Sequence, residues 1–191
     1  QALFENTTGD YNVAVGALAL DNASTADNNV AVGHASLTAN TTGEENVASG
    51  TSALYYNTTG IGNVGLGYQT LYYNTTASNN VAVGKNALLV NTTGASNTAV
   101  GALALDANTT ASYNTAVGSA AAGANTTGAV NTAVGYHSLT LNTTGTANVA
   151  LGAYALAANT TADYNTAVGY TSLYVNTTGT GNSALGKGSL D

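Results

Sequence analysis

Residues 91–107 read Asn-Thr-Thr-Gly-Ala-Ser-Asn-Thr-Ala-Val-Gly-Ala-Leu-Ala-Leu-Asp-Ala, and this pattern decides the fold. Units of the same seventeen residues follow one another through the chain without an insertion or deletion. Positions are numbered from the first residue of the unit, and units start at residues 6, 23, 40, 57, 74, 91, 108, 125, 142, 159 and 176. Residues 1–191 are therefore expected to form a single tandem-repeat domain. Neither end carries a capping unit of different sequence, so we expect a segment of a longer array.

The unit predicts one coil of an all-β solenoid, or β-roll, with eleven stacked coils. Seventeen residues are too few for a pair of helices. Residues 97–101 alternate β-branched and small side chains and predict a short strand. The Gly at position eleven marks a bend, and a second short strand is expected around the Leu at position fifteen. Stacking at about 4.8 Å per coil gives a rod of roughly 50 Å.

Asn occupies position seven in every unit. In stacked coils each residue meets its own copy above and below, so identical amides can form a hydrogen-bonded ladder. We expect a structural ladder here, with a left-handed turn residue as the alternative. The ladder residues are Asn12, Asn29, Asn46, Asn63, Asn80, Asn97, Asn114, Asn131, Asn148, Asn165 and Asn182.

Position one begins an Asn-Thr-Thr segment, and each such segment is an acceptor sequence for N-glycosylation. Ala23 replaces the Asn once, but Asn22 before it forms Asn-Ala-Ser. We expect this column to lie in a turn, to project into solvent and to carry covalent N-linked glycans; the alternative is that Asn and Thr serve only as turn and ladder residues. The candidate sites are Asn6, Asn22, Asn40, Asn57, Asn74, Asn91, Asn108, Asn125, Asn142, Asn159 and Asn176.

The composition excludes several classes of function. Only two residues are Lys or Arg, against nine acids, so a phosphate backbone could not be neutralised and nucleic-acid binding is excluded. No run of about 18 apolar residues is available for membrane insertion. With 44% hydrophobic residues, no Cys and only 6% charged residues, the chain is typical of an extended fibrous protein.

Chemistry that needs converging groups is not expected. His34 and His137 fall six coils apart, so no metal site or catalytic site is predicted, and the protein is not expected to be an enzyme or to hold a cofactor. Asp10, Asp27 and Glu44 should stack at position five, either as a solvated acidic edge or around a cation.

Aromatic pairs are expected along the rod. Tyr55 and Tyr56 should stack on Tyr72 and Tyr73, with Tyr68 nearby. This arrangement either replaces missing core or forms a platform for a sugar ring.

The strand motif Asn-x-Ala-Val-Gly, followed by x-x-Ala/Ser-Leu, resembles the head repeats of YadA-type trimeric autotransporter adhesins. It also resembles Asn-Thr-Thr-Gly repeat regions of bacterial and phage tail-fibre proteins that end in an endosialidase-type chaperone. Residues 12–16, 97–101 and 131–135 match the strand of the adhesin head. The resemblance implies a left-handed β-roll trimer that holds binding surfaces away from a cell.

Three functions follow as hypotheses. The first is a structural extracellular fibre, glycosylated once per coil and associating with itself along or around the fibre. The second is an adhesin head or tail-fibre shaft on a cell or virion surface, which binds a host glycan or protein. The third is an ice-binding solenoid, although adjacent Thr residues in a strand are expected to face opposite sides.

Overall fold

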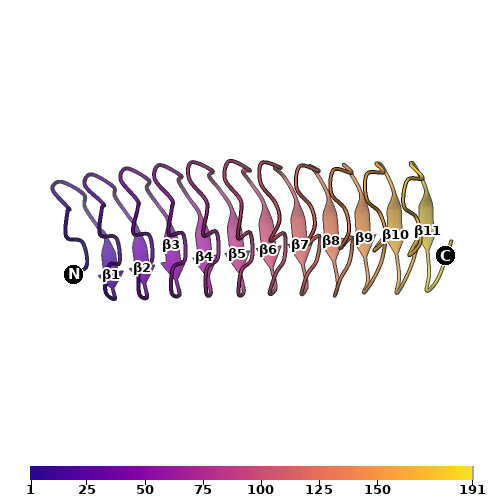
Figure 1. The fold of residues 1–191 in the computed structure, drawn as a ribbon, viewed down its shortest axis with the longest axis horizontal. Helices are drawn as coiled ribbons and strands as arrows, with labels where there is room; N and C mark the ends of the chain where they lie inside the picture. Colours follow the sequence, from indigo (N-terminus) through magenta and orange to yellow (C-terminus); the bar gives the residue numbers. More distant parts are fainter. Residues whose placement is uncertain (191) are drawn as a thin grey trace.

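The computed structural model describes residues 1–190, which form a straight rod of stacked coils with the chain ends at opposite ends of the rod (Figure 1). The fold is an all-β solenoid without helices in this range. Each coil contributes one three-residue strand to a single parallel sheet, and the strands lie in sequence order from β1 to β11. The strands are β1 (Val13–Val15), β2 (Val30–Val32), β3 (Val47–Ser49), β4 (Val64–Leu66), β5 (Val81–Val83), β6 (Thr98–Val100), β7 (Thr115–Val117), β8 (Thr132–Val134), β9 (Val149–Leu151), β10 (Thr166–Val168) and β11 (Ser183–Leu185).

The strands pair in a register of one repeat. Thr98 of β6 pairs with Thr115 of β7, and Ala99 pairs with Ala116. The middle residue of each strand points inward, whereas the residues on either side of it face outward, as the alternation along a strand requires. Ala99 is fully buried and Val100 is 36% exposed. The seventeen-residue frame therefore fixes which neighbour each residue meets.

Leu at position fifteen forms a continuous buried column, as the repeat predicts. Leu88, Leu105 and Leu139 have no solvent-exposed surface, and Ala122 takes the place of Leu in one coil. The core is otherwise built from Ala at positions nine and fourteen. The interior is thus too narrow for aromatic side chains, which lie outside it.

The prediction of a second strand around this Leu is wrong. Leu105 has a φ of 50°, and Leu103, two residues earlier, has a φ of 60°. Both lie in the left-handed region, which costs an L-residue roughly 1–2 kcal/mol. Hydrogen bonds to both neighbouring coils hold the bend: Leu103 N–H donates to the Lys85 carbonyl at 3.0 Å, and Leu105 N–H donates to the Ala121 carbonyl at 3.1 Å. The segment is a hydrogen-bonded bend and not a strand.

The Gly at position eleven has the positive φ that its invariance predicts. Its φ lies between 117° and 136° in every coil. A Cβ on Gly135 would lie 2.6 Å from the carbonyl carbon and oxygen of Gly152 in the next coil. Only Gly allows the coils to approach this closely at the end of the strand.

Candidate functional surfaces

The Asn side chains at position one lie inside the rod. All of them from Asn40 to Asn159 are fully buried. Asn91 Nδ2 donates to Asn74 Oδ1 in the preceding coil at 3.0 Å and to the Gly94 carbonyl in its own coil at 2.8 Å. The expected solvent-facing orientation is therefore wrong, because the nitrogen that would carry a glycan is buried and uses both of its protons.

Two candidate glycan sites differ from the rest. Asn6, in the first coil, and Asn22, displaced by one position, are exposed, and Asn176 near the other end is half-buried. Ala23 fills the place of the missing Asn and is fully buried. Asn22 thus projects outward while the regular column points inward, which reverses the expected arrangement.

The Asn side chains at position seven form the ladder that their repetition predicts. The backbone N–H of Asn97 donates to Asn80 Oδ1 at 2.9 Å, and Asn97 Nδ2 donates to the Ala111 carbonyl of the next coil at 2.8 Å. The left-handed turn residue is the one before it: Ser96 has a φ of 58°. In this ladder the Asn side chains therefore bond to the backbone of the next coil.

The carbonyl at position four links the two Asn columns. The Gly94 carbonyl accepts one bond from Asn80 Nδ2 at 2.9 Å and another from Asn91 Nδ2 at 2.8 Å. The small residue at position four leaves room for both amides. Sequence reasoning kept this second ladder only as the alternative to glycosylation, and the Gly or Ala three residues after each Asn of position one is a signal that favours the ladder.

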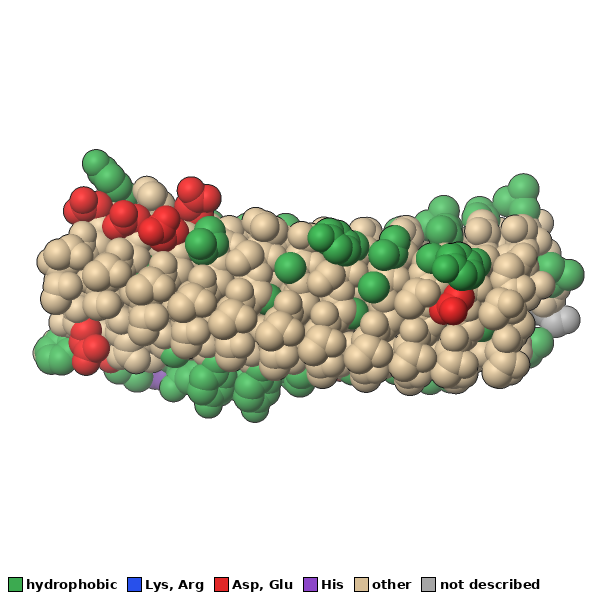
Figure 2. All heavy atoms as spheres, turned by 90° about the horizontal axis from the view of Figure 1, so that it is seen from above, with side chains coloured by type: hydrophobic (Ala, Val, Ile, Leu, Met, Phe, Trp, Pro, Cys, Tyr) green, Lys and Arg blue, Asp and Glu red, His purple; other side chains and the backbone are tan. Residues whose placement is uncertain are grey.

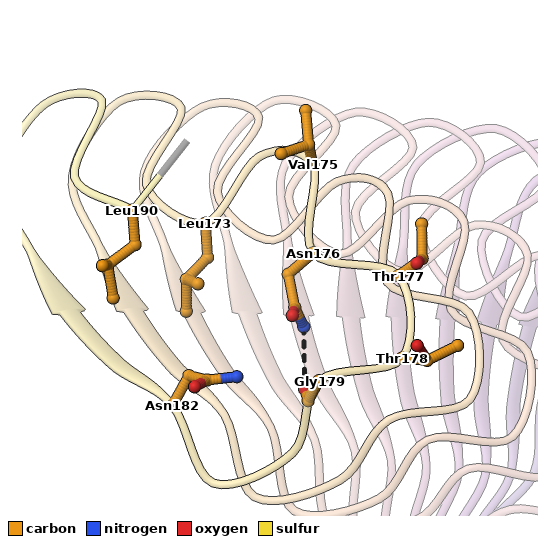
Figure 3. A pocket seen from close by; sticks show the side chains of 8 residues that line it. All are labelled: Leu173, Val175, Asn176, Thr177, Thr178, Gly179, Asn182 and Leu190. Atoms are coloured by element: carbon orange, nitrogen blue, oxygen red, sulfur yellow. Dashed lines mark hydrogen bonds between the residues drawn. The ribbon is translucent and has the colours of Figure 1, made fainter.

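The expectation that the two Thr residues after position one face opposite sides of a strand is wrong. They occupy a bend between the inward-pointing residues of positions one and four, and neither is buried. Figure 3 shows this at the last coil, where Asn176 points toward Gly179 while Thr177 and Thr178 lie on the outer turn. The Thr hydroxyl at position two joins neighbouring coils: Thr58 Oγ1 donates to the Thr75 carbonyl at 3.0 Å.

The predicted tyrosine stack is present. Tyr55 stacks on Tyr72 with ring centroids 5.3 Å apart, and Tyr56 stacks on Tyr73 at 5.5 Å. Desolvation, and then the neighbouring Tyr56, raises the pKa of Tyr72 above its usual value. These rings cover the outside of the Leu bend.

A second aromatic cluster was not predicted. His137 stacks on Tyr154 with ring centroids 5.7 Å apart, and Tyr136, Tyr170 and Tyr174 contact Tyr154 edge-on. Desolvation, and then a hydrogen bond with Tyr136, raises the pKa of Tyr154. The cluster escaped the repeat pattern because its members occupy positions twelve, thirteen and sixteen in different coils.

Acidic residues gather toward one end of the rod (Figure 2). Asp10, Asp27 and Glu44 occupy position five of the first three coils. Asp27 Oδ1 accepts a bond of 2.7 Å from the backbone N–H of Asp10. Within residues 1–190, no three His, Asp or Glu side chains form a group that could hold a metal ion. His34 is exposed, and His137 belongs to the aromatic cluster six coils further along.

Cavities lie at both ends of the rod, where the stack stops. The larger, of about 440 Å³, is the open end of the interior and is lined by Leu173, Asn176, Asn182 and Leu190 among others (Figure 3). Asn165 Nδ2, one coil from this end, is the one buried side-chain nitrogen without a partner in the described part of the chain.

The fold and its interior define a narrow parallel β-solenoid closed by two hydrogen-bonded Asn columns. No protein-family model matches the chain, and neither a curated protein nor a solved structure matches it. The described residues include no helix long and apolar enough to cross a membrane.

Proposed function

We propose that this chain is a segment of a structural fibre, a rigid spacer whose length is set by the number of repeats. The observation that carries the proposal is the uninterrupted sheet from β1 to β11, in which each strand pairs only with the strands of adjacent coils. Each coil bonds its neighbours at many points, so that the rod resists bending. An extracellular, cell-surface or virion-surface setting suits such a spacer.

The glycan coat is not part of this proposal. Attachment at Asn91 would break its bonds to Asn74 and Gly94 and would bring a sugar into the packed interior. Among the eleven candidate sites, only Asn6 and Asn22 are exposed. We therefore expect the intact mass of native material to show at most a few glycans, and not one per coil.

Self-association is supported by the outer face of the sheet. Positions eight and ten carry no charged residue in any coil, and position ten is Val or Leu in ten of eleven coils. Val100, Val117 and Val134 are each 36–37% exposed. A strip about 50 Å long offers an apolar contact of the kind that joins copies of one chain, and we assign it to further copies of this chain around the fibre.

The spacer is tested by changing its length. Deletion of residues 91–107 removes one whole repeat, and we expect a folded rod shorter by about 4.8 Å in small-angle X-ray scattering. Deletion of residues 91–98 is the matched control, because it breaks the register and should unfold the adjoining coils. If removal of a whole repeat collapses the rod, the spacer proposal fails.

The association surface is tested by three substitutions on the sheet, Val100→Lys, Val117→Lys and Val134→Lys. The control carries Ser96→Lys, Tyr113→Lys and Val130→Lys in the same coils, on exposed position six. We expect sedimentation equilibrium to show oligomers for the native chain and the control, and monomers for the sheet variant. A monomeric native chain contradicts this assignment.

The second aromatic cluster favours carbohydrate binding as a second candidate function. Tyr136, Tyr170 and Tyr174 are 42–52% exposed, and all three contact the ring of Tyr154. Such rings can stack on the apolar face of a neutral sugar. Retention of the chain on a neutral polysaccharide gel should be lost in Tyr136→Ala/Tyr170→Ala and kept in Tyr113→Ala; equal retention of both variants contradicts this candidate.

A further inference from the structure

Thr at position three is the only exposed residue that never changes among the repeats. Asn at position seven and Gly at position eleven are the other two invariant positions, and both are explained by the interior and by the coil contact. The position-three residues are classed as exposed in every coil: Thr8, Thr25, Thr42, Thr59, Thr76, Thr93, Thr110, Thr127, Thr144, Thr161 and Thr178.

The fold does not require these hydroxyls. The Thr at position two donates its hydroxyl to the next coil, as Thr92 Oγ1 does to the Thr109 carbonyl at 3.0 Å. The neighbouring Thr93 instead bonds through its backbone, with its N–H donating to the same carbonyl at 3.3 Å. Its side chain projects from the rod with a free hydroxyl and a methyl group. The invariance of position three therefore reflects what lies outside the rod.

The segment that carries these Thr residues is uncharged. Positions one to four contain only Asn, Ala, Thr, Ser and Gly in every repeat, whereas all Asp, Glu, Lys and aromatic residues fall at positions five, six, twelve, thirteen, sixteen and seventeen. Figure 2 shows a broad face of uncharged polar side chains and backbone along the rod, crossed by a few apolar groups and one acidic group. We call positions two and three of all coils the threonine face.

A periodic partner fits this face better than a small ligand does. A small ligand would be held by one or two coils, whereas a periodic surface can contact the Thr of every coil at once. The coil step of about 4.8 Å is close to the repeat of water oxygens along one axis of hexagonal ice. The hydroxyl and methyl groups of these Thr residues recur at that step and can hold a row of ordered waters, and positions two and three themselves carry no charge.

We propose that the threonine face binds the surface of ice crystals. This function goes beyond that of a spacer and does not depend on association through the sheet, whose apolar position ten lies on a different part of the coil. The adjacent Thr pair can act together because both members lie on the outer bend, whereas a strand would have placed them on opposite sides.

The experiment compares the full chain with a variant of the threonine face in three consecutive coils, Thr93→Tyr, Thr110→Tyr and Thr127→Tyr. The control carries Ser96→Tyr and Val130→Tyr, which with the native Tyr113 places Tyr at exposed position six of the same three coils. Circular dichroism first establishes that all three proteins hold the same β signal. Thermal hysteresis and the shape of single ice crystals are then measured.

We expect the native chain and the control to separate the freezing and melting temperatures and to produce faceted crystals. The face variant should lose at least nine-tenths of that separation. A folded native chain that leaves ice crystals round and growing at the melting temperature overturns the proposal. Equal activity of the face variant and the native chain also overturns it, and so does a change of oligomeric state in the face variant alone, which would make this face a protein interface.

Discussion

Asn46 and Asn57, eleven residues apart and on neighbouring coils, donate hydrogen bonds to one and the same acceptor, the carbonyl oxygen of Gly60. The distances are 2.8 Å from Asn46 Nδ2 and 3.0 Å from Asn57 Nδ2. The contact recurs with the period of the repeat, so the two buried columns act as one network. Buried amides that are fully paired rigidify a core, and unpaired ones are costly.

The position-one column lacks its Asn at one place, Ala23. Because Asn6 and Asn40 lie in the coils on either side, Ala23→Asn should add bonds to Asn6 Oδ1 and the Ala26 carbonyl and should accept one from Asn40. At roughly 1 kcal/mol for each buried hydrogen bond, we expect the variant to be more stable by about 1–3 kcal/mol. Thermal unfolding measures this gain, and a loss of stability would show that the second coil does not share the common geometry.

The inward Leu column predicts a sharp contrast within one bend. Leu105 is fully buried, whereas Ala107 is only half-buried. Leu105→Asp should destabilise its coils by about 3–5 kcal/mol, because it buries an unpaired carboxylate, and Ala107→Asp should cost little. Limited proteolysis of the two variants reports local opening, and equal resistance of both would contradict the frame.

Gly at position eleven should not tolerate a side chain. Gly135→Ala places a Cβ against the Gly152 carbonyl at a φ of 136°, so we expect loss of the β signal in the adjoining coils. Gly128→Ala is the control. Its Cβ also meets a carbonyl, that of Gly145. Other coils, however, already carry Ala at this position, namely Ala77, Ala111 and Ala162, which shows that the coil can adjust there. Circular dichroism should separate the two, and similar losses would refute the distinction.

Asp106 predicts a dependence of stability on pH. Desolvation raises the pKa of this carboxyl, although bonds from the backbone of Asp106 and Ala107 oppose the shift. Leu89 and Gly123 occupy the same position in the adjacent coils, so no charged group faces it there. The folded state therefore holds the proton more tightly than the unfolded state, and this residue's contribution falls as pH rises above the ordinary pKa of Asp.

The variant Asp106→Asn removes this effect. It should be more stable than the native chain at pH 7, and the difference should shrink as pH is lowered below 4. The midpoint of urea unfolding at several pH values provides the measurement. A difference that stays constant with pH would show that the carboxyl is not desolvated.

Periodicity predicted much of this structure, because a repeat constrains every coil at once. The unit length, the ladder at position seven, the bend at Gly101 and the inward Leu105 all follow from identical residues stacked in register. The orientation of Asn91 could not be predicted in the same way, since Asn-Thr-Thr fits both a glycosylation site and a buried ladder.

Backbone conformation accounts for the remaining errors. Alternation along a strand predicts that successive residues face opposite sides, but Ser96, Leu103 and Leu105 adopt left-handed φ values of 50–60°. Such bends in non-Gly residues have no local sequence signal and persist only because the neighbouring coils over-determine them. The aromatic cluster around Tyr154 was missed for another reason, since its rings occur at three positions of the unit and in only three of the coils.

The most direct test of the account compares Asn91→Asp with Thr93→Ala. Both substitutions abolish the same glycosylation sequence, but only the first removes the Nδ2 bonds to Asn74 and Gly94, since the Thr93 side chain is exposed. Hydrogen exchange of the backbone amides in residues 74–110 is the measurement. If the interior is closed by Asn ladders, exchange speeds up at least a hundredfold in Asn91→Asp, an effect of about 3 kcal/mol, and stays near native in Thr93→Ala. Native-like protection in Asn91→Asp, or equal loss in both variants, would contradict the account.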